Sequence, residues 1–76
     1  MRWRERLAAL DEAQLMAAID RHRLAGEATL EATLLALVEL LGDVPADSAA
    51  RELGVERALV LRAISGLQAR GRWPST

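Results

Sequence analysis

The stretch SAARELGVERALVLRAISGLQARG, residues 48–71, decides the fold that this sequence predicts. Its spacing of small and apolar residues indicates a short helix, a tight turn at Gly54-Val55, and a longer helix that begins at Glu56 or Arg57. Glycine readily takes the positive φ that is needed where one helix stops and another begins. The stretch therefore predicts a helix-turn-helix.

A leucine-rich segment precedes this motif. Residues 29–41 predict a helix whose apolar stripe is wider than one contact surface requires, so we expect it to be central and to pack on two sides. Gly42 is expected to end it, and Asp47 or Ser48 to cap the next helix. Residues that favour strands never alternate at a period of two, so we expect no sheet.

These segments resemble the DNA-reading half of bacterial helix-turn-helix regulators, particularly the MarR-type winged-helix group. The resemblance is carried by Leu34–Val38, Gly42-Asp43, Ala49–Val55, Val60, Ile64, Leu67 and Arg70-Gly71. It covers roughly residues 29–71 and implies a tri-helical DNA-binding core. Only residues 72–76 follow Gly71, too few for a wing, so the better comparison is a wingless three-helix reader.

Residues 1–26 predict N-terminal helices that either pack on this core or form a dimer interface. Asp11 with Gln14 fits a capping box, which would start a second helix that ends near Leu24. Without a break at Asp11, residues 3–24 would form one helix, and the sequence leaves both alternatives open. The side chains expected on the inward face of this helix are Leu15, Met16, Ile19 and Arg23 or Leu24.

Size and composition favour a single all-α domain of four or five short helices over residues 1–76. Half of the residues (51%) are hydrophobic, but only two are aromatic, Trp3 and Trp73, so the core must be built from Leu, Ile, Val and Ala. We expect each tryptophan to close one end of that core. The longest apolar run has five residues, whereas a membrane-spanning helix needs about 18–20. We therefore expect a cytoplasmic protein that does not enter a membrane.

The sequence gives little reason to expect chemistry. There is no cysteine, and His22 is the single histidine, so no metal or cofactor site is expected. No nucleophile with a base, no paired acid and base, and no glycine-rich phosphate loop is found, which argues against an enzyme.

The charge distribution permits a DNA-binding face, although the net charge is −1. Residues 1–10 hold three arginines and one acidic residue, residues 11–45 two arginines and seven acidic residues, and residues 46–76 five arginines and three acidic residues. In a helix-turn-helix the second helix enters the major groove. The residues expected to contact double-stranded DNA are Ser48, Arg57, Ala58, Arg62, Ser65, Arg70 and Arg72. Because one copy with so few arginines would bind DNA weakly, we expect a homodimer. The function expected of it is that of a transcriptional regulator.

Two other interpretations stay open. The arginines would also serve as a solvated face that keeps a leucine-rich protein in solution. Leu59 and Leu61 flank Val60, so apolar side chains cover most of the circumference of the second helix. That pattern favours a helical protein-interaction or homodimerisation module without DNA contact.

Overall fold

The computed structural model describes residues 2–74, which form five helices and no strand. The helices are α1 (Trp3–Ala8), α2 (Glu12–Leu24), α3 (Thr29–Leu41), α4 (Ala46–Leu53) and α5 (Arg57–Ala69). The prediction of an all-α fold is confirmed. The helix breaks between residues 8 and 12, so the N-terminal region forms two helices and not one.

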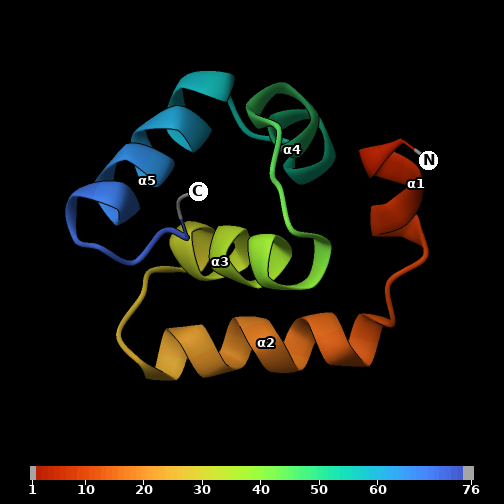
Figure 1. Cartoon of the computed structure of the whole chain (residues 1–76), viewed down its shortest axis with the longest axis horizontal. Helices are drawn as coiled ribbons and strands as arrows, with labels where there is room; N and C mark the ends of the chain where they lie inside the picture. The colour runs from red at the N-terminus through yellow and green to blue at the C-terminus, as the bar shows by residue number, and fades with distance from the viewer. Residues whose placement is uncertain (1, 75–76) are drawn as a thin grey trace.

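The central element is α3. It lies between α2 on one side and α4 and α5 on the other, while α1 packs against α3 and α4 (Figure 1). Seven of its thirteen residues are buried, which agrees with the expectation that it packs on two sides. Leu34 and Leu37 meet Val60 of α5 and Ala49 of α4 in the core. Burying an aliphatic side chain of this size contributes about 1.5–3 kcal/mol, so these contacts hold the helices together.

Trp3 attaches α1 to the end of α3. Its indole is buried, and Nε1 donates a hydrogen bond to the carbonyl oxygen of Asp43 at 2.7 Å. Arg6 donates to the carbonyl oxygen of Leu41 and pairs with the Asp43 carboxylate at 3.2 Å. Arg6 thus satisfies the carbonyl of the last residue of α3, which the helix end leaves without a partner, and Trp3 satisfies a carbonyl of the loop that follows. The expectation that Trp3 closes one end of the core is confirmed, and Trp73 is half-buried against the same core.

α2 begins where the sequence indicates, but its inward face differs from the prediction. The Asp11 carboxylate accepts a hydrogen bond from the Ala13 amide at 3.0 Å, as a capping residue does. Ala18 is buried, and Leu15 packs against the core. This orientation of the helix turns Met16 and Leu24 outward, where they are 50% and 89% exposed. The prediction that Met16 and either Arg23 or Leu24 face the core is therefore wrong, since Arg23 is exposed as well.

The turn between α4 and α5 consists of residues 54–56. Gly54 has φ +70°, and the amide of Val55 donates to the carbonyl oxygen of Ala50 at 3.0 Å, so α4 ends in a left-handed glycine cap. The start of α4 differs from the prediction: its capping residue is Pro45, not Asp47 or Ser48. Proline's fixed φ suits the entry to a helix, and α4 begins at Ala46, two residues earlier than a cap at Asp47 would place it.

Candidate nucleic-acid interface

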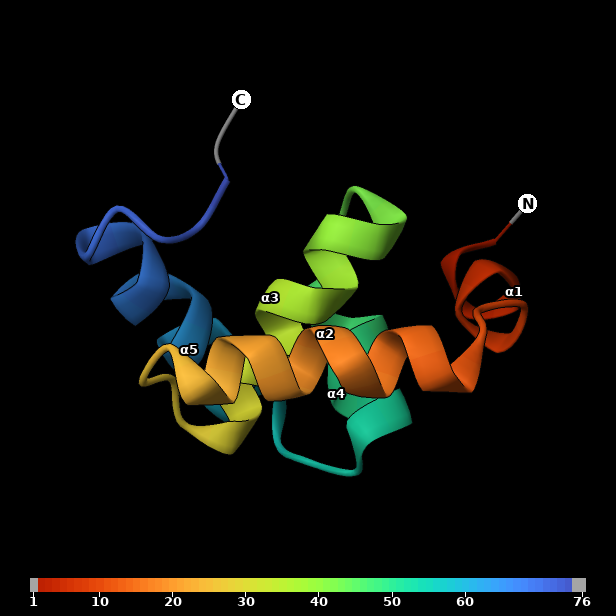
Figure 2. The same ribbon diagram turned by 90° about the horizontal axis from the view of Figure 1, so that it is seen from below.

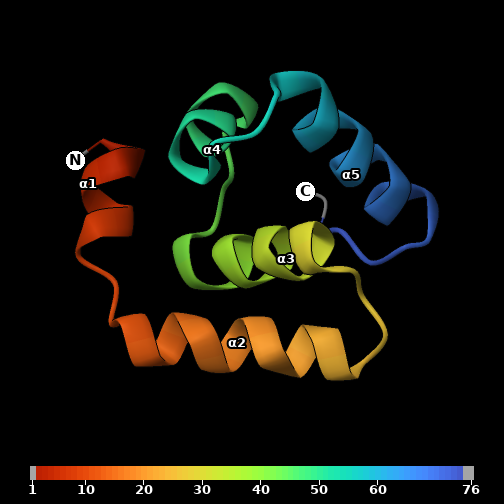
Figure 3. The same cartoon turned by 180° about the vertical axis from the view of Figure 1, so that it is seen from behind.

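α5 presents one face to the core and another to solvent. Val60 and Leu67 are completely buried. Ala58, Arg62 and Ser65 are exposed and follow the i, i+4, i+7 spacing of a single helix face. α5 forms an outer edge of the molecule, with α3 and α4 on its inner side (Figures 1 and 3). Three of the seven residues expected at DNA thus lie together on an open helix face.

Arg57 begins α5 and is also exposed, but its guanidinium forms an ion pair with the carboxylate of Asp47. Asp47 lies in the first turn of α4, so the pair links the starts of the two helices of the motif. Both side chains are well exposed, and a surface pair of this kind contributes about 0–1 kcal/mol to stability. The pair instead neutralises one of the charges that would face a phosphate.

Ser48 is the third residue of α4 and is half-buried. No side chain caps the first turn of this helix, so its backbone amides remain available to an anion. The carboxylate of Asp47 lies in the same turn and opposes the approach of a phosphate. The structure therefore keeps Ser48 near a helix N-terminus but gives that terminus a negative neighbour.

Arg70 and Arg72 form ion pairs with Glu27. Arg70 Nη2 lies 2.8 Å from Glu27 Oε1, and Arg72 Nε lies 2.8 Å from Glu27 Oε2. The Glu27 side chain is only 4% exposed, whereas the side chains of the two arginines remain about half exposed. A buried carboxylate needs such partners, because leaving a charge unpaired away from water is costly. These two arginines consequently hold the chain after α5 against the loop between α2 and α3.

Glu27 has a structural role that the sequence does not reveal. Its position between Gly26 and the start of α3 indicates only a loop residue. Arg70 lies 43 positions further along the chain, and no local pattern connects the two. Only the packing of α5 on α3 brings them together.

Leu59 and Leu61 lie on either side of the Arg62 face. They are 42% and 40% exposed, so the chain leaves both partly uncovered. Leu59 and Arg62, with Arg70 and Glu31, line a shallow hollow of about 190 Å³ between α3 and α5. An apolar side chain beside an arginine is compatible with binding to another protein as well as to a nucleic acid.

A second polar cluster joins α2 to α3. Arg21 pairs with Glu39; the hydrogen bond from Arg21 holds the pKa of the Glu39 carboxyl below its ordinary value and raises the pKa of Arg21. His22 Nε2 lies 3.9 Å from Glu39 Oε2 and has no hydrogen-bond partner in the part of the chain that the structure describes. Over residues 2–74, no three His, Asp or Glu side chains lie close enough to hold a metal ion.

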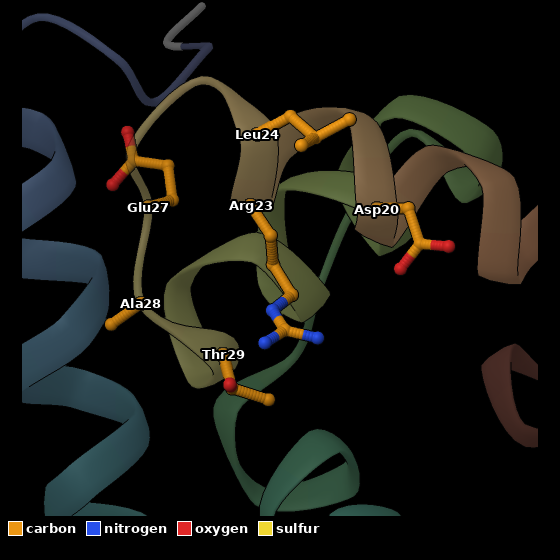
Figure 4. A pocket seen from close by; sticks show the side chains of 6 residues that line it. All are labelled: Asp20, Arg23, Leu24, Glu27, Ala28 and Thr29. Carbon is orange, nitrogen blue, oxygen red and sulfur yellow. The ribbon is translucent and has the colours of Figure 1, made fainter.

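A larger hollow of about 550 Å³ opens where α2 meets α3. The residues that line it are Asp20, Arg23, Leu24, Glu27, Ala28 and Thr29 (Figure 4). Glu27 is already paired, and the Arg23 and Asp20 side chains point in different directions (Figure 4). This lining does not converge on a reacting atom as a catalytic site does.

Comparison with known proteins gives no relative: no family model, no curated protein and no solved structure matches the chain. Across residues 2–74, none of the helices combines the length and the apolar character that crossing a membrane requires.

Proposed function

We propose that this chain is a non-enzymatic, double-stranded DNA-binding protein, a small cytoplasmic transcriptional regulator that places α5 in the major groove. The observation that carries the proposal is the open face of Ala58, Arg62 and Ser65 on a helix that a glycine turn directs away from α4. A recognition helix needs such a face, because the major groove is about 12 Å wide and admits one helix.

Each residue of this face has a contact that suits its chemistry. The Arg62 guanidinium is exposed and has no ion pair with any residue from 2 to 74, so it can bind guanine O6 and N7 as a bidentate donor. Ser65 can donate to or accept from a base edge, and the Ala58 methyl can contact the methyl of thymine. Arg57 would exchange its pair with Asp47 for a phosphate.

The charge of the motif limits the affinity of one copy. Residues 46–69 hold three arginines and three acidic residues, so few phosphates are neutralised. The longest dimension of the chain is 30 Å, whereas half-sites one helical turn apart are separated by about 34–36 Å. Two copies, each reading one half-site, would supply the affinity that one copy lacks.

The experiment is a binding titration at fixed low salt against a duplex selected from a random pool. The Arg57→Ala/Arg62→Ala variant should bind at least about tenfold more weakly than the unaltered protein, because each arginine supplies a charge-assisted contact. The Arg2→Ala/Arg4→Ala variant is the matched control: it removes the same charge at the start of α1, where both side chains are exposed, and should lose much less. Equal loss in both variants would reduce the effect to net charge and remove the role assigned to α5.

A second candidate is a protein-interaction module that docks through α5 without DNA. The exposure of Leu59 and Leu61 on the helix that also carries Arg62 favours it. Leu59→Ser/Leu61→Ser separates the candidates, since it removes the apolar contact and keeps every charge. Retained DNA affinity in this variant supports the groove-reading proposal. Absence of DNA binding in all variants, together with a partner lost only when the leucines are replaced, supports the second candidate.

A further inference from the structure

α2 carries an apolar stripe on its outer side as well as on its inner side. Ala13, Met16, Ala17 and Leu24 are all exposed and follow an i, i+3, i+4, i+11 spacing, which is the stripe that a helix normally buries. Leu24 is 89% exposed and Met16 50%. α2 lies in front of the other four helices when the molecule is seen from below, so no other helix covers this side (Figure 2).

The charges beside this stripe are segregated along the helix. Glu12 lies in its first turn and Arg23 in its last turn. The two residues are eleven positions apart, about three turns of 3.6 residues, so they lie above one another on the same side of the helix. Glu12 and Arg23 are exposed, and neither has an ion pair within the described residues 2–74.

We propose that the outer face of α2 pairs with the same face of a second copy of this chain, with the two helices antiparallel. A two-fold axis that passes between the two α2 helices, level with their midpoints, places Glu12 of one copy opposite Arg23 of the other. The reverse contact follows by symmetry. The same arrangement brings Leu24 over Ala13 of the second copy, a large side chain against a small one. The charge pattern thus selects the antiparallel orientation, because parallel helices would oppose like charges.

Asp20 sets the strength of this contact. It lies within the stripe, is exposed and would approach Asp20 of the second copy near the two-fold axis. A helix of thirteen residues is also only about 20 Å long. One face of it therefore buries less than the roughly 800 Å² per partner that a stable interface buries. The association is therefore weak, with a dissociation constant on the order of 10–100 µM.

The partner is a second copy of this chain, and the surface is separate from the α5 face. It requires no DNA, so its test is independent of the proposed function. Sedimentation equilibrium from about 5 µM to 1 mM protein, without DNA, should show a monomer–dimer equilibrium in the unaltered chain. Met16→Ser/Leu24→Ser should weaken the dimer at least tenfold. Leu59→Ser/Leu61→Ser, which changes two exposed side chains on α5, should leave it within twofold.

A charge exchange tests the antiparallel orientation. Glu12→Arg and Arg23→Glu should each weaken the dimer about five- to tenfold, and the double exchange should return it to within about threefold of the unaltered chain. Asp20→Asn should strengthen it. Circular dichroism on every variant confirms that the helices persist. A monomer at all concentrations, a dimer lost only with the α5 variant, or a double exchange weaker than either single exchange overturns the proposal.

Discussion

Arg57, the first residue of α5, forms its ion pair with Asp47, in the first turn of α4. The pair crosses the turn at Gly54 and places a carboxylate beside the part of α5 that is proposed to meet phosphate. In the DNA-binding account, Asp47 competes with the nucleic acid for Arg57.

Removing this competitor should strengthen DNA binding. Asp47→Asn frees Arg57 and deletes one negative charge at the N-terminus of α4, so affinity for a duplex at low salt should rise about two- to tenfold. Fluorescence anisotropy with a labelled duplex measures it. Asp11→Asn is the control for net charge. Asp11 caps α2, outside the α4–α5 motif, and asparagine can replace it as the cap. An equal rise in both variants would contradict a local effect of Asp47.

Two glycines of the motif should respond oppositely to alanine. Gly54 has φ +70°, which an L-side chain rarely adopts, so Gly54→Ala should lower the free energy of unfolding by about 1–2 kcal/mol. Gly66 lies inside α5, and an added methyl would meet nothing within 4 Å. Gly66→Ala should raise the stability by up to about 1 kcal/mol, because alanine favours helix. Urea denaturation of both variants checks the pair, and destabilisation by Gly66→Ala would be the contrary result.

Leucine-to-alanine changes within α5 should divide by burial. Leu67 is completely buried, so Leu67→Ala should cost about 2–5 kcal/mol, a large part of the stability of so small a domain. Leu61 is 40% exposed, and Leu61→Ala should cost less than about 1 kcal/mol. Thermal unfolding followed by circular dichroism compares them. Similar melting temperatures would mean that α5 faces the core by a different side.

The contact of Glu27 with two arginines should be worth more than an exposed pair. Glu27→Ala removes a buried carboxylate and its two hydrogen bonds to charged donors, with an expected cost of about 1–3 kcal/mol. Arg70→Ala leaves Arg72 as a partner and should cost less. Chemical denaturation measures both. A cost below about 0.5 kcal/mol for Glu27→Ala would show that the arginines do not hold the end of the chain.

Glu39 should contribute a pH dependence. Its hydrogen bond from Arg21 lowers its pKa in the folded protein below the unfolded value of about 4.3. A lowered folded pKa stabilises the fold above pH 4.3, and this contribution is lost as the pH falls through the folded pKa. The unaltered protein should therefore lose more stability below pH 4.3 than Glu39→Gln. Parallel curves for the two proteins would contradict the assignment.

Much of the architecture follows from local signals. Gly26, Gly42 and Gly54 end three helices at the places their sequence positions indicate, since each takes a positive φ. The wide leucine stripe of residues 29–41 predicts a central helix, and α3 is central. Periodicity alone misjudges α2, because apolar side chains lie on both sides of it and the sequence does not say which side the core takes.

The candidate site is less accessible from sequence. The open face of α5 follows from the positions of Val60 and Leu67, but the arginine contacts do not. Glu27 captures Arg70 and Arg72 only after α5 has packed on α3, a contact between distant parts of the chain. Whether an arginine that the sequence predicts at DNA already has an ion-pair partner therefore depends on the tertiary structure.

The most direct test of the central claim is an NMR titration of the labelled protein with a selected duplex, recording the backbone amides at low salt. If α5 reads DNA, the largest chemical-shift changes occur from Arg57 through Ser65, with smaller changes at the start of α4 and little change at the middle of α2. No change when the concentrations of protein and duplex both exceed the measured dissociation constant would contradict the claim that α5 reads DNA. The largest changes at α2 would contradict it as well.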